Sequence, residues 1–262
     1  MKNFAINMRA NAYDKYARWQ RPSGRFSTLR KLNNWLVPAL CPLCGEVQES
    51  SSALVCNCCA ANIAPNPAGC ALCNDQIENG SICGRCITKP PAFDSLSAPW
   101  LYKTPMDELI GKAKFYENYA LAYQLGLAAA DYFLACYSEP YSEPMPQALV
   151  PVPLYIGRLA ERGYNQASLI ADGISKISNV PVFKNIVYKN LATPAQSTLG
   201  VKTRATNLRN SYVAHKLSGI HHLAIVDDVA TSGSTFNELS RELKNVGYQR
   251  VDCWCLARSK KQ

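Results

Sequence analysis

Eight cysteines arranged as four C-x-x-C pairs constrain the fold of this chain more than any other feature. Two sulfurs on one tight turn can reach a single ion, and two such turns complete a tetrahedral Cys₄ site that suits Zn²⁺. The pairs are separated by 11, 10 and 9 residues, which fits sequential grouping with a β-hairpin inside each group. We therefore expect two structural zinc sites, with interleaved pairing as the alternative. Their ligands would be Cys41, Cys44, Cys56 and Cys59 in the first and Cys70, Cys73, Cys83 and Cys86 in the second.

A disulfide framework and a redox dithiol are the other interpretations of these cysteines. Disulfides need an oxidising compartment, and the N-terminal residues contain no apolar stretch typical of an export signal. A single C-x-x-C pair can be redox-active, whereas four in series favour closed, non-catalytic zinc sites. Cys58 is an extra thiol that could replace a neighbouring ligand. Cys136, Cys253 and Cys255 stand in apolar segments and are predicted to be core residues.

Most of the net charge of the chain is concentrated at its N-terminus. Residues 1–40 contain eight Lys and Arg against one acid, Asp14, and so carry +7 of the total of +9. Aromatic residues such as Trp19 and Trp35 lie among them, a mixture that could hold single-stranded nucleic acid by phosphate contacts and base stacking. A solvated, partly disordered tail is the simpler interpretation. The Arg-rich, acid-poor composition also has a faint similarity to an organellar transit peptide.

Three regions are expected along the 262 residues. Residues 1–38 form the basic leader, 39–90 a small Cys-rich double zinc ribbon, and 91–262 an α/β domain. No run of 18 or more apolar residues occurs, so we expect no membrane span. Strands alternate with helices in the third region, which predicts a mainly parallel sheet. The strands are expected at Ser95–Tyr102, Ala148–Val150, Val182–Tyr188, His222–Val226 and Val251–Leu256, and the helices at Met106–Phe115, Tyr119–Tyr137, Gly163–Ser178 and Ser234–Val246.

The segment Leu223–Thr235 carries the sharpest chemical signal. An apolar strand runs into two adjacent carboxylates, Asp227 and Asp228, and a loop of small and hydroxyl residues then opens a helix. Ligands of open α/β sheets bind beyond the C-terminal ends of the strands. Backbone N–H groups of such a loop, together with the helix N-terminus, favour an anion, and the carboxylates can accept hydrogen bonds from sugar hydroxyls. The alternative is an ordinary strand and capped helix, which does not require the acidic pair.

This segment resembles the motif by which type I phosphoribosyltransferases bind phosphoribosyl pyrophosphate (PRPP). The resemblance implies that Asp227 and Asp228 hold the ribose 2′- and 3′-hydroxyls. It also implies that the loop holds the 5′-phosphate. The loop residues concerned are Ala230, Thr231, Ser232, Gly233, Ser234 and Thr235. The same resemblance implies Mg²⁺ bound with PRPP.

Two further segments are candidates for the pyrophosphate end of the same ligand. Arg158 and Arg162 follow the strand that ends in Val150-Pro-Val-Pro, and in the resembled fold the loop after this strand meets pyrophosphate. Lys202 and Arg204 lie in a long polar segment that is similar to the flexible loop closing over PRPP. For both pairs the alternative is an ordinary solvated basic surface.

From Cys41 to its end the chain resembles the ComF family, which includes the competence protein of DNA uptake and GntX-type proteins. The shared features are the cysteine knuckles, Lys114-Phe115, Val150-Pro-Val-Pro, Arg162-Gly-Tyr-Asn-Gln166, Gln196, Arg204, Asn207 and the PRPP loop. The resemblance implies a PRPP-binding accessory factor of natural transformation, acting in the cytoplasm with single-stranded DNA and DNA-uptake proteins as partners. One alternative is an active phosphoribosyltransferase with an amine or nucleobase acceptor. Another is a nucleic-acid-binding module whose PRPP site has lost its chemistry. No segment indicates an acceptor pocket.

Overall fold

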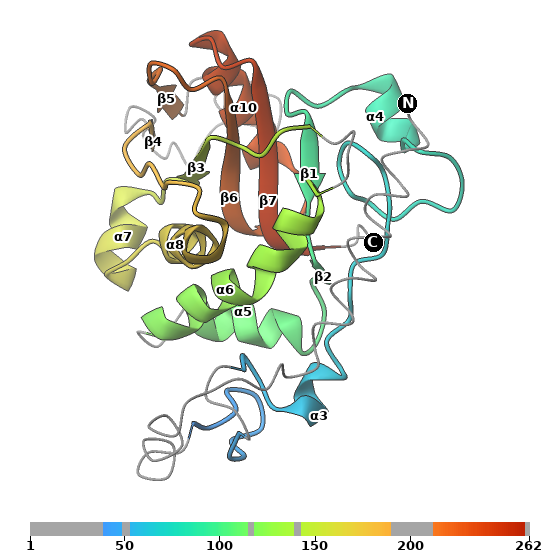
Figure 1. The fold of residues 1–262 in the computed structure, drawn as a ribbon, viewed down its shortest axis with the longest axis vertical. Coiled ribbons are helices and arrows are strands. Elements are labelled where there is room, and N and C mark those ends of the chain that lie inside the picture. Colours follow the sequence, from blue (N-terminus) through green and yellow to red (C-terminus); the bar gives the residue numbers. More distant parts are fainter. Residues whose placement is uncertain (1–38, 49–52, 115–117, 139–142, 190–211, 260–262) are drawn as a thin grey trace, which may run out of the picture.

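The computed structural model describes residues 39–48, 53–114, 118–138, 143–189 and 212–259 (Figure 1). The basic leader, with Trp19 and Trp35, lies outside the described residues. The same holds for the segment that contains Lys202 and Arg204. The nucleic-acid and flexible-loop predictions made for these residues therefore stay predictions.

A five-stranded parallel sheet forms the centre of the molecule and confirms the predicted α/β class. The strand order is β1-β7-β6-β3, and the short β2 also pairs with β7. Pro151 at the end of β3 lies opposite Val226 of β6, so the chain that follows β3 runs beside the acidic pair. The strands are β1 (Ser95–Ser97), β2 (Trp100–Leu101), β3 (Ala148–Pro151), β6 (His222–Ala230) and β7 (Arg250–Arg258).

Helices cover both faces of the sheet, and the side chains of β6 alternate between them. Leu223 and Ile225 pack in the cluster of α10 (Ser234–Asn245). Ala224 and Val226 pack in the cluster that contains the buried side chains of α5, α6 and α8. A strand buried on both faces needs a continuous apolar run, which is why His222–Val226 was recognisable in the sequence. The three helices of the second cluster are α5 (Met106–Lys114), α6 (Tyr119–Ala135) and α8 (Gln166–Ser178).

Two glycines let α6 and α8 pack closely enough to place the start of α8 beside the sheet. A Cβ atom on Gly126 would lie 2.2 Å from the carbonyl oxygen of Ile170. A Cβ atom on Gly173 would lie 2.3 Å from the carbonyl oxygen of Tyr123. Both distances are shorter than real contacts allow, so any larger residue would push the helices apart. The N-terminal residues of α8 take their positions in the site from this contact.

Several element boundaries differ from the sequence predictions. Strand β6 runs through the acidic pair to Ala230 because β7 continues to pair with it as far as Arg258. The helix predicted at Gly163–Ser178 is present as α8 and begins at Gln166. A helix that was not predicted, α7 (Ile156–Arg162), precedes it and ends at Gly163, which has a φ of 76°. Of the predicted strand Val182–Tyr188, only Val187 and Tyr188 lie in β4 (Val187–Lys189), which pairs antiparallel with β5 (Tyr212–Ala214).

The cysteine-rich segments pack against both layers of the α/β region. Buried residues around the first four cysteines, such as Val55 and Ile63, belong to the cluster of α5 and α6. Cysteines of the second group belong to the cluster of α10. Hairpins were predicted between the two knuckles of each group, and the described residues there form no strand pair; residues 49–52 lie outside the described residues. A bridge between Leu40 and Val47 spans the first knuckle of the first group. Two short helices, α3 (Asn57–Ala60) and α4 (Gly84–Thr88), occur at the second knuckles.

Candidate functional site

The cysteines assemble into two groups of four in sequential order, as predicted. Within each group all four sulfurs lie within 4.8 Å of one another. The Sγ atoms of Cys44 and Cys56 are 3.7 Å apart, and those of Cys73 and Cys83 are 3.6 Å apart. A tetrahedral Zn²⁺ with ligands at about 2.3 Å would separate its sulfurs by about 3.8 Å. A disulfide needs a sulfur–sulfur distance of about 2.0 Å, so both groups fit structural zinc and neither contains a disulfide.

Both groups are built from the same two local pieces. The first knuckle of each ends in a residue with positive φ, Gly45 at 77° and Asn74 at 55°, which reverses the chain just after the second sulfur. The second knuckle begins a short helix. Its first cysteine, Cys56 or Cys83, donates its backbone N–H to a sulfur of the first knuckle at 3.4 or 3.3 Å. Such donors suit a thiolate, the form in which cysteine binds metal.

A cavity of about 430 Å³ lies where strands β3 and β6 end. Asp227 and Asp228 of β6 and Thr235 of α10 line one part of it, and Arg158 and Arg162 of α7 line another. The structure thus brings together the predicted ribose-binding carboxylates and the predicted pyrophosphate-binding arginines, although about 70 residues of chain separate them. Of the predicted phosphate loop, Thr235 lines the cavity, Ala230 is the last residue of β6, and residues 231–234 connect the two.

The two carboxylates differ in their surroundings. Asp228 is buried. It forms an ion pair with the Nζ of Lys114 at 3.0 Å and accepts a hydrogen bond from the Nε2 of Gln166 at 3.3 Å. Burial, and next the charge of Asp228, raises the pKa of the Asp227 carboxyl to about 8. The backbone N–H of Asp228 and the Lys114 ammonium oppose that rise. Hydrogen bonds from hydroxyl groups, or a bound cation, would reduce the electrostatic repulsion between two carboxylates that lie this close together.

For several residues that line the cavity, no role was predicted from the sequence. Lys114, Asn165 and Gln166 lie in motifs that the family resemblance contains, but their partners come from other elements. Asn165 caps α8 and donates its side-chain N–H to the carbonyl of Val152 at 2.9 Å, while Arg162 donates to Gln166 at 3.1 Å. Lys189 and Tyr212 also line the cavity, from β4 and β5. No local sequence pattern identifies these two residues, because the paired strands β4 and β5 are separated in the chain by residues 190–211.

The loop after β6 has the form that an anion site requires. Gly233 adopts a φ of 75°, and α10 begins at the next residue. Ser232 accepts the backbone N–H of Ser234 at 3.2 Å through its hydroxyl oxygen. Thr231, Ser232 and Ser234 are exposed, and the Ser232 hydroxyl donates to that of Ser234 at 2.9 Å. Backbone donors and a helix N-terminus are the means by which such loops bind phosphate.

Comparison with known proteins places the chain among relatives of similar length. It is 33% identical over 213 residues to competence protein F of Haemophilus influenzae, an alignment that covers 78% of this chain and 90% of the relative. The chain belongs to the ComF family. It is also 31% identical to the DNA utilization protein YhgH of Salmonella typhi and 30% identical to that of Escherichia coli K12, each over 85% of this chain and 98% of the relative. No protein-family model matches.

One solved structure with a detectable likeness is a purine phosphoribosyltransferase from Pyrococcus horikoshii. The two chains are 18% identical, the match covers 58% of this ComF-family chain and 74% of the solved one, and the TM-score is 0.27. Among the described helices, none combines the length and apolar character that crossing a bilayer would require.

Proposed function

We propose that this ComF-family protein binds PRPP, with Mg²⁺, in the cavity at the ends of β3 and β6. The observation that carries the proposal is the placement of Asp227 and Asp228 beside the hydroxyl-rich loop, with Arg158 and Arg162 on the same cavity. PRPP carries a 5′-phosphate and a pyrophosphate on opposite sides of a ribose. The loop, the carboxylates and the arginines supply one group for each of these parts.

The charges around the cavity support a polyanionic ligand. Lys114, Arg158, Arg162 and Lys189 line it together with the two aspartates. Lys114 is paired with Asp228, and Arg158, Arg162 and Lys189 add further positive charge to the cavity wall. Mg²⁺ bound with PRPP would supply further neutralisation of the pyrophosphate.

We further propose that PRPP binding serves DNA uptake in the cytoplasm, where the protein would act as an accessory factor of natural transformation. Its relatives carry the names competence protein F and DNA utilization protein, which favours this role over a general metabolic one. Contacts with single-stranded DNA and with DNA-uptake proteins are part of the proposal. An active phosphoribosyltransferase is the second candidate. Its chemistry would need a nitrogen nucleophile at the ribose anomeric carbon while pyrophosphate leaves.

The proposed site predicts a measurable, Mg²⁺-dependent affinity for PRPP. Isothermal titration calorimetry of the full chain with and without Mg²⁺ should give saturable binding at one site. If the titration gives no heat of binding at millimolar concentrations of PRPP, the proposal is overturned. Pyrophosphate release that depends on an added amine or nucleobase acceptor, measured in the same samples, separates the two candidate functions, because hydrolysis of PRPP needs no acceptor and binding alone releases none.

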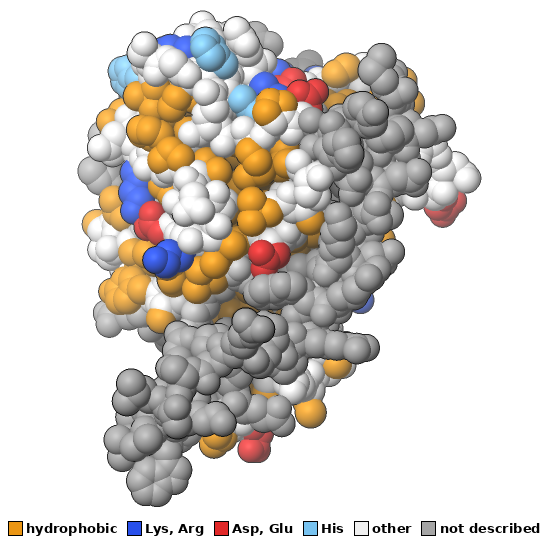
Figure 2. Space-filling model, viewed as in Figure 1, with side chains coloured by type: hydrophobic (Ala, Val, Ile, Leu, Met, Phe, Trp, Pro, Cys, Tyr) orange, Lys and Arg blue, Asp and Glu red, His pale blue; other side chains and the backbone are white. Residues whose placement is uncertain are grey.

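The proposed single-strand contacts predict binding that depends on the leader. Residues 1–40 carry +7 of the total net charge of +9, which makes them the main source of attraction for a polyanion. On the face shown in Figure 2, charged side chains of the described residues are sparse among apolar ones. Affinity for single-stranded DNA should fall with salt, with a log–log slope of about −0.7 per phosphate contacted. Deleting residues 1–38 should weaken DNA binding and leave PRPP affinity unchanged.

Tryptophan variants separate this proposal from generic charge attraction. Trp19→Ala or Trp35→Ala should cost about 1–3 kcal/mol for each stacked base, with heparin binding unaffected. If the full chain binds heparin and single-stranded DNA equally, and the tryptophan variants lose nothing on either polymer, then the leader does not provide a single-strand site.

A further inference from the structure

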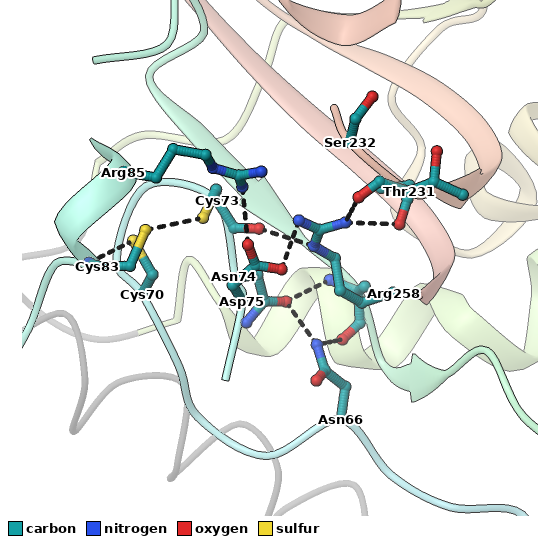
Figure 3. A network of polar contacts seen from close by, with 12 residues as sticks. Asn66, Cys70, Cys73, Asn74, Asp75, Cys83, Arg85, Thr231, Ser232 and Arg258 are labelled. Carbon is teal, nitrogen blue, oxygen red and sulfur yellow. Dashed lines mark hydrogen bonds and ion pairs between the residues drawn. The ribbon is translucent and has the colours of Figure 1, made fainter. Parts of the chain in front are cut away.

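Arg258, the last residue of β7, lies buried beneath the loop that follows β6 (Figure 3). Its side chain is 2% exposed, which is rare for a charged group and requires complete pairing. The Nη1 atom donates to the carbonyl oxygen of Ala230 at 2.7 Å and also to that of Thr231. One guanidinium group therefore holds the first two peptide groups of the proposed phosphate loop.

This contact determines which way the loop presents its N–H groups. The peptide bond is planar and trans, so a carbonyl and the following N–H point in opposite directions. Holding the carbonyls of Ala230 and Thr231 at Arg258 turns the N–H groups of Thr231 and Ser232 away from it. Within the described residues these two N–H groups donate to no acceptor. They are therefore available to an anion, while the carbonyl oxygens, which would repel it, are withdrawn.

The other side of Arg258 is attached to the second cysteine group. Its Nε donates to the carbonyl of Cys73 at 3.1 Å, and its Nη2 pairs with the Oδ1 of Asp75 at 2.5 Å. Asp75 also pairs with Arg85 at 2.7 Å, and Arg85 lies between the last two cysteines of that group. Figure 3 shows these contacts as one continuous network from the sulfur atoms to the loop. The first cysteine group packs instead on the opposite face of the sheet.

We propose that Arg258 is a positioning residue that orients the phosphate loop, and that the second Cys₄ site holds Arg258 in place. The proposal rests on the proposed PRPP function and specifies how its 5′-phosphate site is formed. It assigns different roles to the two metal sites: the second supports ligand binding, whereas the first supports only the fold. A purely structural role for Arg258 would instead affect all ligands in proportion to lost stability.

The test compares Arg258→Lys with Arg250→Lys in the full, metal-loaded chain. Lysine keeps the charge of Arg258 but cannot span two carbonyls, Cys73 and Asp75 at once. Arg250 is the matched control, because it pairs with Asp252 at the other end of the same strand. Equilibrium dialysis with PRPP, ribose 5-phosphate and magnesium pyrophosphate reads the two ends of the ligand separately. Circular dichroism and thermal unfolding report whether each variant is folded.

We expect Arg258→Lys to weaken PRPP and ribose 5-phosphate binding at least about tenfold and to leave pyrophosphate binding unchanged. Arg250→Lys should leave all three within about twofold, since distant sites act independently. Equal losses for both ends of the ligand, or no loss, would overturn the positioning role. If ribose 5-phosphate and magnesium pyrophosphate bind too weakly to measure, the positioning role is judged from the PRPP affinity of Arg258→Lys relative to that of Arg250→Lys. Wild-type protein that binds no PRPP would instead refute the proposed function.

A second pair of variants tests the attachment to the metal site and does not require changing Arg258. Asp75→Asn removes the charge that holds Arg258 but keeps the side-chain shape and should also weaken ribose 5-phosphate binding. Cys86→Ser in the second group should weaken it too, whereas Cys59→Ser in the first group should not. Metal content measured on each sample verifies which site was lost. Equal ribose 5-phosphate affinity in the two cysteine variants would contradict the separate roles of the sites.

Discussion

The double substitution Asp227→Ala, Asp228→Ala is expected to abolish measurable PRPP binding. Losing two charge-assisted hydrogen bonds to the ribose hydroxyls should cost about 3–6 kcal/mol in total. Long-range charge acts in the opposite direction, because removing carboxylate charge from a cavity that also contains Arg158 and Arg162 should favour any phosphate ligand. A fall in affinity would therefore show that the lost contacts of the carboxylates outweigh the gain from long-range charge. Calorimetry with PRPP and Mg²⁺ measures it.

Pyrophosphate serves as the internal control for this variant because it lacks the ribose. Its affinity should rise or stay constant when the carboxylates are removed, the more so because Lys114 loses its partner Asp228. Asp172→Ala is the control protein, since Asp172 is a partly exposed acid of α8 paired with Lys184 rather than a residue of the cavity. PRPP affinity that survives in the double variant would place the sugar elsewhere.

Purified protein is expected to contain two equivalents of Zn²⁺, and Cys41→Ser should retain one. Structural zinc sites bind with apparent free energies on the order of 10 kcal/mol, so losing a ligand has a large local effect. Cys41, Val55 and Ile63 share a hydrophobic cluster with α5 and α6, so the destabilisation should reach those helices. Hydrogen exchange should show it there first and leave α10, on the other face, protected. Metal analysis and mass spectrometry provide the count.

Cys58 offers a matched control because it lies next to a ligand but outside both groups. Cys58→Ser should keep two equivalents of metal and wild-type exchange. Retention of both metals in Cys41→Ser with loss in Cys58→Ser would mean that the extra thiol is a ligand. Protein without metal whose eight cysteines are disulfide-bonded would contradict the zinc sites altogether.

Much of the candidate site was visible in the sequence because its signals are local. A C-x-x-C pair places two sulfurs on one turn whatever surrounds it, so the cysteine groups could be predicted and their sequential order was confirmed. The acidic pair follows an apolar run and precedes a loop and helix, a pattern that needs only neighbouring residues. The mainly parallel sheet followed from the alternation of strand and helix periods, and was confirmed.

Element boundaries were harder to predict because pairing partners decide them. The extension of β6 to Ala230 depends on β7, and the division between α7 and α8 depends on the positive φ of Gly163. Spacing alone predicted a hairpin between the knuckles of each group, whereas the described residues there form no strand pair and a short helix begins at the second pair of each group. Intrinsic preference is a weak guide wherever tertiary contacts compete with it.

By itself the sequence determined which residue types are present and how they are grouped over a few turns: eight thiols in four pairs, two carboxylates beside a hydroxyl-rich loop, and strands with two buried faces. Only the tertiary structure decided which distant groups meet them. Lys114 at the end of α5 pairs with Asp228 of β6, and Arg258 of β7 contacts both Cys73 and Ala230, which lie far apart in the sequence. Such contacts depend on strand order and register, which bring together residues that no local periodicity relates.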